Sequence, residues 1–356
     1  MILGDTTLIP QNVVPDGTRK VSVFTKEGTY VGDCNFDNLK LPELGKKLYS
    51  VGLLSDTHTT TLVSAETEDS KADLVRAIRY LSNKVDITCV CGDLVSFYDD
   101  WDAVEFHRST IRDNKGKMTV LEVSGNHESY SREDKAVPVT DDYMKDVTDY
   151  LDDGNGNPIC YTYLKESVVD GKTVTDVYLM CGTVNWSAQF NNTTWTWFTE
   201  QLTKYKNNRV FLFAHAFIKE PGADKKATSK YCGDATGIIG THLVMGSTTQ
   251  AFINLMANYP NVLYFHGHSH VMLEMQEYTQ SLNPPLPNNY DHELGCHSIH
   301  IPSTSRPRSI TNGRVEEISE SEGYIMDVYE NHVVLKGIDF TTEQQIPIAT
   351  YCLETM

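Results

Sequence analysis

The 356-residue sequence has no long apolar run and no cleavable leader. A transmembrane helix needs ~20 consecutive apolar residues, and no stretch of this chain approaches that length. The N-terminus also has no positively charged segment followed by an apolar segment, which is the pattern of a secretory signal. We therefore expect a protein that does not enter the membrane and is located in the cytoplasm.

Basic residues are in the minority. Lys and Arg together number 30 against 48 Asp and Glu, which gives a net charge of −18. Proteins that bind long nucleic acids present basic faces to the phosphate backbone, so a long nucleic acid is not the expected partner. A nucleotide is still a candidate substrate, because bound metal cations can supply local positive charge.

The sequence also has no Cys-x-x-Cys pair among its eight scattered cysteines. Cys89, Cys91 and Cys181 lie in apolar, strand-like runs. This pattern favours free, buried thiols in a reducing compartment over a disulfide framework.

Residues 1–47 differ from the rest of the chain. Two short β-type runs, 20–25 and 29–32, are separated by Pro, Gly, Asp and Asn, and no helical periodicity is visible. We interpret residues 1–47 as a small β-rich N-terminal appendage and residues 48–356 as the main domain.

Within the main domain, apolar strand-like runs alternate with amphipathic helical patterns, which predicts an α/β fold with largely parallel strands. The middle of the chain, 132–175, is acidic and rich in turn residues, and we expect a surface loop and a hairpin there. The C-terminal runs 324–329 and 332–338 predict antiparallel strands that complete a second sheet. The other strands are predicted at 49–54, 86–91, 118–123, 177–181, 209–214 and 262–265, and helices at 70–83, near 101–107, at 193–206 and at 248–258.

The strand 49–54 leads directly into Asp56 and His58. Residues two apart in a strand point the same way. If the strand geometry continues, a carboxylate and an imidazole leave the sheet side by side at its carboxyl end. Ligands bind at this end of the strands in open α/β sheets.

Four later strand ends carry similar side chains. Each alone is consistent with ordinary turn chemistry. Five strand ends that all supply oxygen or nitrogen ligands, and no thiol, instead favour a site for divalent metals such as manganese, iron or zinc. The ligands suffice for two ions that share one bridging carboxylate. In chain order the motifs are Asp56-x-His58, Gly92-Asp93, Gly125-Asn126-His127-Glu128, His215 and Gly267-His268-Ser269-His270.

This series resembles the signature of the calcineurin-like metallophosphoesterases, over about residues 49–340. The resemblance implies a four-layer α/β/β/α sandwich with a binuclear metal centre. It also implies hydrolysis of phosphomonoesters or phosphodiesters by a metal-bridging hydroxide. By motif position, Asp56, His58 and His270 would hold one metal, Asn126, His215 and His268 the other, Asp93 would bridge them, and His127 would be the catalytic histidine, oriented by Glu128.

One position departs from a branch of this family. Purple acid phosphatases supply a tyrosine ligand three residues after the Gly-Asp aspartate. That position is Ser96 here, and Tyr98 has the wrong offset. A tyrosinate-to-iron site is therefore not expected.

Residues outside the five motifs are further candidates. Arg306 and Arg308 could grip a phosphate with a bidentate fork, although surface arginines in a polar loop are the alternative interpretation. Substrate specificity would depend on the loops 59–69, 129–160 and 219–247. The candidates for supporting the ligands or approaching the site are His266, His297, His300, Asn185 and Trp186.

Two other functions are open at this stage. The first is a structural or adhesion protein that keeps the fold, with a virion or other protein partner bound through residues 1–47. It rests on the appendage and on a loose similarity of residues 333–350 to metallophosphoesterases of phages and prophages of Firmicutes. The second is a nuclease, which the net charge disfavours. A small phosphoester is the expected substrate of the main hypothesis.

Overall fold

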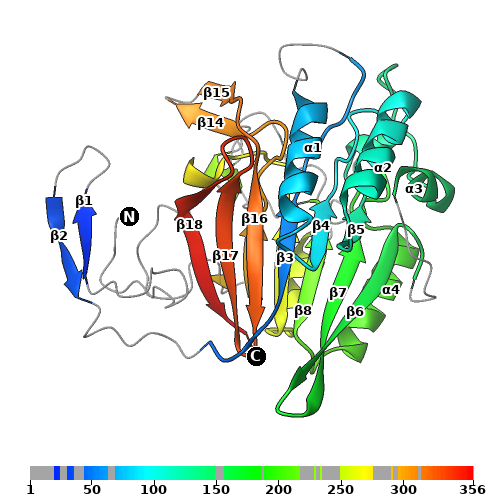
Figure 1. The fold of residues 1–356 in the computed structure, drawn as a ribbon. Coiled ribbons are helices and arrows are strands. Elements are labelled where there is room, and N and C mark those ends of the chain that lie inside the picture. Colours follow the sequence, from blue (N-terminus) through cyan, green and yellow to red (C-terminus); the bar gives the residue numbers. More distant parts are fainter. Residues whose placement is uncertain are drawn as a thin grey trace.

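Two large sheets form the centre of the chain in the computed structural model (Figure 1). Each sheet has six strands. The structure describes residues 20–24, 30–35, 44–62, 69–148, 156–186, 188–216, 228–229, 233–234, 249–275, 290–291, 296–311 and 314–355.

The first sheet joins segments from both ends of the main domain. In spatial order it contains β18 (Gln344–Glu354), β17 (His332–Asp339), β16 (Glu322–Tyr329), β3 (Lys47–Leu54), β4 (Ile87–Cys91) and β5 (Thr119–Val123). The strands β3, β4 and β5 are parallel, and β16 to β18 are antiparallel. The prediction that the C-terminal strands complete a second sheet was wrong, because β16 pairs with β3. Alternation of apolar residues predicts a strand but not its pairing partner.

The second sheet is also mixed. Its four inner strands are parallel, and its two edge strands are antiparallel to them. In spatial order it contains β12 (Tyr290–Asp291), β13 (Cys296–His300), β11 (Val262–His266), β8 (Val210–Ala214), β7 (Lys172–Cys181) and β6 (Cys160–Val169).

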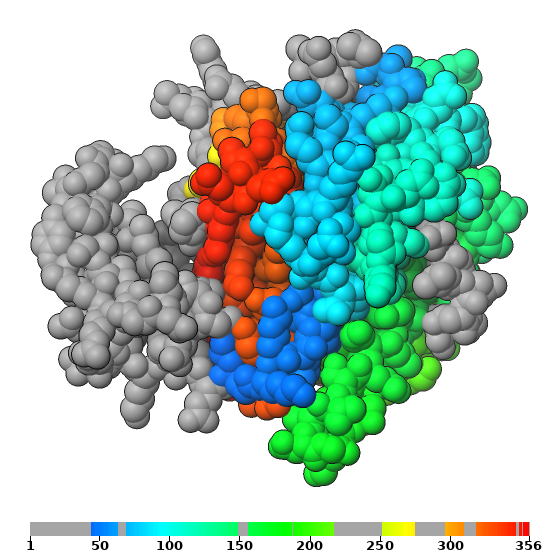
Figure 2. All heavy atoms as spheres, in the orientation of Figure 1, coloured from blue at the N-terminus to red at the C-terminus, as the bar shows by residue number. Residues whose placement is uncertain are grey.

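Helices cover the outer faces of the two sheets. The helix α1 (Ser70–Leu81) follows β3 and buries the stripe Leu74, Ala77, Ile78 and Leu81, as its periodicity predicts. In Figure 2, α1 and α2 (Trp101–Asn114) lie together on one face of the molecule, beside the C-terminal strands. The other helices are α3 (Asp141–Val147), which the sequence pattern did not predict, α4 (Asn192–Lys204) and α5 (Thr249–Met256).

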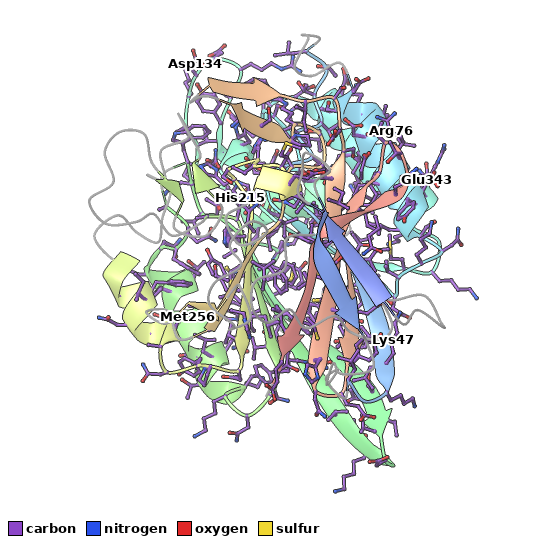
Figure 3. All side chains as sticks on the ribbon, turned by 90° about the vertical axis from the view of Figure 1, so that its left-hand side faces the viewer. Lys47, Arg76, Asp134, His215, Met256 and Glu343 are labelled. Atoms are coloured by element: carbon purple, nitrogen blue, oxygen red, sulfur yellow. The ribbon has the colours of Figure 1, made fainter. Side chains whose placement is uncertain are left out.

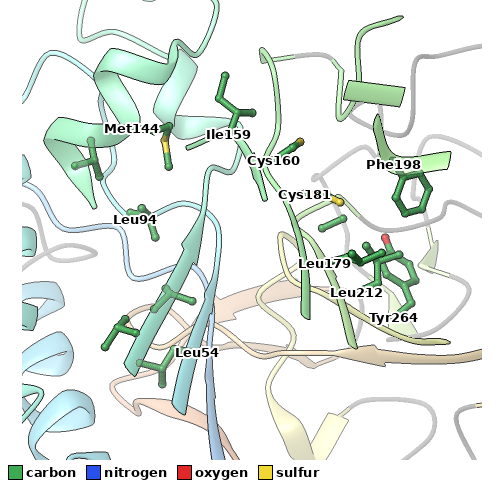
Figure 4. Close-up of a cluster of buried hydrophobic side chains, with 14 of the residues drawn as sticks. Leu54, Leu94, Met144, Ile159, Cys160, Leu179, Cys181, Phe198, Leu212 and Tyr264 are labelled. Carbon is green, nitrogen blue, oxygen red and sulfur yellow. The ribbon is translucent and has the colours of Figure 1, made fainter. Parts of the chain in front are cut away.

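The strands bury both faces, so their sequences are nearly continuous apolar runs. Between the sheets, Val51 and Leu53 belong to the same core cluster as Phe213 and Phe265. On the helix-covered faces, Leu54 shares a second cluster with residues such as Leu179, Phe198 and Leu212 (Figure 4). The expected α/β class and the layered α/β/β/α arrangement are confirmed.

Residues 20–24 and 30–35 form two paired antiparallel strands, β1 (Lys20–Phe24) and β2 (Tyr30–Asn35). This agrees with the expected β character, while the domain boundary at residue 47 stays a prediction. Most of the loop 219–247 lies outside the described residues. Among the helices that the structure describes, none is long and apolar enough to cross a membrane.

A buried ion pair links the two sheets at the amino ends of β8 and β3. Arg209 donates to Asp176 through Nε at 2.8 Å and through Nη2 at 2.7 Å. Its Nη1 donates to the carbonyl of Tyr329 in the first sheet at 2.7 Å. Tyr49, also in the first sheet, donates its hydroxyl to Asp176 at 2.7 Å.

Removing one partner of this pair leaves the other charge buried and unpaired. We expect Arg209→Met to lower the free energy of unfolding by about 3–5 kcal/mol, measured by urea denaturation. The double variant Arg209→Met with Asp176→Leu should recover part of that loss, because no lone charge remains. A single-variant loss below about 1 kcal/mol would contradict the role of the pair, since exposed pairs contribute that little.

Candidate metal centre

The five motifs meet at one edge of the two sheets. The strands β3, β4 and β5 are parallel neighbours, so the residues that follow them lie together. The strands β8 and β11 are parallel neighbours in the facing sheet. His215, which follows β8, lies inside the molecule between the sheets (Figure 3).

These residues form two groups that share one carboxylate. In the first group, ligand atoms of Asp56, His58, Asp93 and His270 all lie within 4.8 Å of one another. In the second, Asp93, His215 and His268 meet the same criterion. All of these residues are buried. A carboxylate common to two nitrogen- and oxygen-rich groups is the arrangement that a two-metal centre requires.

Nitrogen and oxygen atoms of these side chains converge to within hydrogen-bond distance. His58 Nε2 lies 3.1 Å from His270 Nε2, and His215 Nε2 lies 3.1 Å from Asp93 Oδ2. Asn126 Oδ1 is buried and accepts no hydrogen bond within the part of the chain that the structure describes. A buried carbonyl oxygen without a partner is unfavourable, and a cation would satisfy it. The residues present therefore fit divalent metal ions.

Backbone hydrogen bonds fix the orientation of two imidazoles. His215 Nδ1 donates to the carbonyl of Cys91 at 2.6 Å, and His270 Nδ1 donates to the carbonyl of Arg306 at 3.2 Å. In both rings Nδ1 carries a proton, so Nε2 is the nitrogen that faces the carboxylates and would bind a metal. Such outer contacts set the tautomer of metal-binding histidines.

The sequence predicts that strand alternation directs Asp56 and His58 into the site. The structure shows instead that turns place them. The strand β3 ends at Leu54, and both residues have positive φ, 52° and 42°. Asp93, His268 and His270 also have positive φ. This conformation costs of order 1–3 kcal/mol for each non-glycine residue. Turns rather than strands therefore direct these side chains.

The motif glycines are explained by close approach. A Cβ on Gly125 would lie 2.2 Å from Asp93 Oδ1. A Cβ on Gly92, whose φ is +85°, would lie 2.5 Å from His215 Nδ1. Only glycine lets the backbone come this near to the shared carboxylate and to its histidine.

The comparisons with known proteins agree with this geometry. A family model described as calcineurin-like phosphoesterase matches residues 49–272, which is more than half of the chain. The chain belongs to the calcineurin-like phosphoesterase family. No curated protein is similar enough in sequence to count as a match.

Two solved structures share the fold of this phosphoesterase domain at low sequence identity. One is titled GAP50, the anchor in the inner membrane complex of Plasmodium, with a TM-score of 0.53, 13% identity, and coverage of 87% of this chain and 90% of that chain. The other is the purple acid phosphatase PPD1 from yellow lupin (Lupinus luteus) seeds, with a TM-score of 0.51 and 13% identity. It covers 94% of this chain, which spans 59% of the lupin enzyme.

The buried carboxylates of the phosphoesterase site are held in their charged form. Burial raises the pKa of Asp56, but attraction to His270 and His215 outweighs it, so the pKa lies below its ordinary value. The pKa of Asp93 is lowered in the same way, chiefly by His215 and His127. Burial would lower the pKa of His215, but the two carboxylates raise it to about 10. Negative charge at the ligand positions favours cation binding.

His127 lies beside the ligand cluster and is half-buried. Its ring centroid is 4.6 Å from that of His58, with the planes at 87°. Its backbone N–H donates to Asp93 Oδ1 at 2.9 Å, and its Nδ1 donates to the carbonyl of Ser96 at 2.8 Å. Nε2 is therefore the nitrogen that can gain and release a proton.

The prediction that Glu128 orients His127 is wrong, because His127 Nδ1 is bonded to the carbonyl of Ser96. The carboxylate of Glu128 instead accepts backbone N–H groups of Asp93, Val95 and Gly125, at 3.1, 3.0 and 2.6 Å. It holds together the turns after β4 and β5, because its side chain points back into them. Burial, and then repulsion from Asp93, raise its pKa to about 8. The backbone carbonyl of Ser96, which no side-chain motif reveals, orients His127.

Both arginine candidates contact this region. The backbone N–H of Arg308 donates to the carbonyl of His270 at 2.8 Å. Arg306 Nη2 donates to Ser96 Oγ at 3.3 Å, so its guanidinium lies on the His127 side of the cluster. The charge of Arg308 also affects His270. Burial is the main cause that lowers the pKa of His270, and repulsion from Arg308 lowers it further.

The remaining candidates divide into near and distant residues. Trp186 lies 5.4 Å from His127 between ring centroids. His300 Nε2 is 2.7 Å from Ser269 Oγ, within the last motif, and the His266 ring is 5.5 Å from that of His300. His297 instead interacts with the backbone of Glu354, at the end of β18.

The shared carboxylate gives a direct test of metal binding. After loading with Mn²⁺ and dialysis, we expect about two ions per wild-type chain by elemental analysis. Asp93→Asn should bind fewer than about one, because neutralising the shared ligand weakens both positions. Glu122→Gln, a buried carboxylate bound to His107 outside the site, is the matched control and should retain full metal content. Unchanged stoichiometry in Asp93→Asn would contradict a shared ligand.

His297 provides a separate prediction about pH. Burial lowers its pKa to about 4 in the folded chain, against about 6.5 when unfolded. The unfolded chain thus binds a proton first as pH falls, so this contribution to stability is complete above pH 6.5 and is lost between pH 6.5 and 4. We expect the free energy of unfolding of wild type to fall about 3 kcal/mol more than that of His297→Gln over this window. If the free energies of unfolding of wild type and His297→Gln, measured by urea denaturation, change in parallel between pH 6.5 and 4, the prediction is contradicted.

Proposed function

We propose that this chain hydrolyses phosphomonoesters or phosphodiesters at a binuclear metal centre. The observation that carries the proposal is the pair of ligand groups that share Asp93, with His127 beside them. Membership of the calcineurin-like phosphoesterase family supports the reaction class.

The ligand geometry supports a division of roles. Asp56, His58 and His270 would bind one ion, and Asn126, His215 and His268 the other, with Asp93 between them. Divalent cations held by these residues would supply Lewis-acid activation of water and neutralise charge on the phosphoryl oxygens. Carboxylate, imidazole and amide ligands suit manganese, iron or zinc. Ser96 in place of a tyrosine argues against a tyrosinate-bound iron.

His127 has the position and tautomer of a general acid. The departing alkoxide needs a proton, and an imidazole can supply it near neutral pH. The hydrogen bond from Nδ1 to Ser96 leaves Nε2 to carry that proton. The bond from its backbone N–H to Asp93 fixes the distance between the ring and the ligand cluster.

Arg306 is the better placed of the two arginines for binding substrate. Its contact with Ser96 Oγ puts the guanidinium beside the residue that orients His127. A guanidinium there can donate two parallel hydrogen bonds to a phosphoryl group. Arg308 would contribute positive charge to the same region.

The general-acid role can be tested with the metal-loaded protein. With p-nitrophenyl phosphate and bis-p-nitrophenyl phosphate, we expect His127→Ala to lower kcat about 10²–10⁴-fold, with metal content unchanged. The loss should be largest for substrates with poorer leaving groups. His332→Ala, a half-buried histidine on β17, is the matched control. Full activity of His127→Ala would exclude the role.

A structural or adhesion role is the second candidate. The Plasmodium neighbour, whose title names it an anchor, supports the idea that this fold can serve such a role. A virion or other protein partner would then bind through residues 1–47. Full metal content with no turnover of any phosphoester would favour this role. Salt-sensitive cleavage of single-stranded DNA would instead support a nuclease.

A further inference from the structure

A group of aromatic side chains lies beside His127. Trp186 is 5.4 Å from His127 between ring centroids, and Tyr130 is 6.2 Å from it. Tyr130 and Trp186 are 4.4 Å apart with their planes at 31°. Phe97 extends the group, 6.2 Å from Tyr130 at 28°. We call Phe97, Tyr130 and Trp186 the aromatic wall.

The wall is assembled from turns of both sheets. Phe97 follows β4 and Tyr130 follows the motif turn after β5, while Trp186 follows β7 in the facing sheet. The backbone N–H of Tyr98 donates to the carbonyl of Tyr130 at 2.9 Å, and the Tyr130 hydroxyl donates to Asp134 at 2.6 Å. The position of the Tyr130 ring is thus fixed at both its backbone and its hydroxyl end.

The wall is half-buried, unlike the rings of the core. Phe198, Phe213 and Phe265 are fully buried between the layers. Aromatic rings stabilise a fold most when their large faces are buried away from water. Three half-buried rings next to a polar, metal-binding cluster therefore contribute less to the stability of the fold than fully buried rings would. A planar ligand could cover the remaining surface.

We propose that the aromatic wall binds the leaving group of the substrate, and that this group carries a planar aromatic ring, as in an aryl or nucleoside phosphoester. This inference rests on the proposed function. His127 donates its proton to the leaving oxygen, so the leaving group lies on the His127 side of phosphorus. Trp186 and Tyr130 are the aromatic side chains on that side, and both rings lie next to His127.

The charges around the wall narrow the substrate class. Asp134 accepts the Tyr130 hydroxyl, and Asp99 accepts the backbone N–H of Arg132 at 3.0 Å. The Arg132 guanidinium pairs with Asp100 and also donates to Thr61 Oγ1 at 2.7 Å. Asp100 is paired with Arg132, but Asp134 and Asp99 beside the wall disfavour a second phosphate there. The leaving group is therefore expected to be an uncharged aromatic alcohol rather than a polyphosphate or polynucleotide.

The test compares two substrates of similar size, one with a planar aromatic ring and one with a puckered saturated ring. Benzyl phosphate and cyclohexylmethyl phosphate have alkoxide leaving groups of similar basicity, so chemistry affects both alike. We expect Trp186→Ala to lower kcat/KM for benzyl phosphate about tenfold more than for the cyclohexyl analogue. Trp186→Phe should restore most of the difference. Trp101→Ala is the matched control, because Trp101 is 54% exposed and packs on Tyr143.

A binding measurement separates this inference from the proposed reaction. Benzylphosphonate and cyclohexylmethylphosphonate cannot be hydrolysed, and calorimetry on the Mn²⁺-loaded protein gives their affinities. Tighter binding of the benzyl compound, lost in Trp186→Ala, would support the wall even if no phosphoester is turned over, and that lack of turnover would count against the proposed function alone. Equal losses for both compounds in Trp186→Ala would overturn the inference. Sensitivity of adenosine 5′-phosphate hydrolysis to Trp186→Ala would identify a nucleobase as the ring, and insensitivity an aryl group.

Discussion

The convergence of carboxylates and imidazoles on Asp93 is the constraint on which the site depends. Isolated buried charges are costly, and each must be paired or bound to a cation. Asp93 lies between His58 and His215, with nitrogen–oxygen distances of 3.6 and 3.1 Å. Its carboxylate accepts the backbone N–H of His127, and its own backbone N–H donates to the carboxylate of Glu128.

The backbone adopts unfavourable left-handed conformations at the residues that converge on Asp93. Five of the residues in the two ligand groups have positive φ, although none is glycine. The strain is offset by hydrogen bonds between neighbouring turns, such as Asp56 N–H to the Gly92 carbonyl at 3.0 Å and His58 N–H to the Asp93 carbonyl at 2.9 Å. Local strain held in place by surrounding structure is common at functional sites. It is consistent with a site shaped for ligands rather than for stability.

The two ends of the sheets serve different purposes. At one end, the strands are followed by carboxylates and imidazoles that can bind cations. At the other, Arg209 and Asp176 complete a closed set of buried hydrogen bonds that joins the sheets. A rigid connection at one end lets the opposite end hold reacting groups at fixed distances. The aromatic wall consists of residues other than the metal ligands: Phe97 and Tyr130 follow β4 and β5, and Trp186 follows β7.

The sequence by itself determined the local features of this protein. Apolar periodicity located helix α1 and the inner strands, and the motif residues identified the ligand types, because these signals depend on near neighbours along the chain. It also indicated Ser96 as a departure from the tyrosine ligand of purple acid phosphatases. These inferences needed no knowledge of what packs against what.

Only the tertiary structure decided which of these features meet. It showed that β16 pairs with β3, that Ser96 rather than Glu128 orients His127, and that Trp186 lies beside that histidine while His297 does not. Asp56 and His58 reach the site through left-handed turns, which strand alternation does not predict. Each of these depends on contacts between residues far apart in sequence, and their geometry is set by packing of the two sheets rather than by local preference.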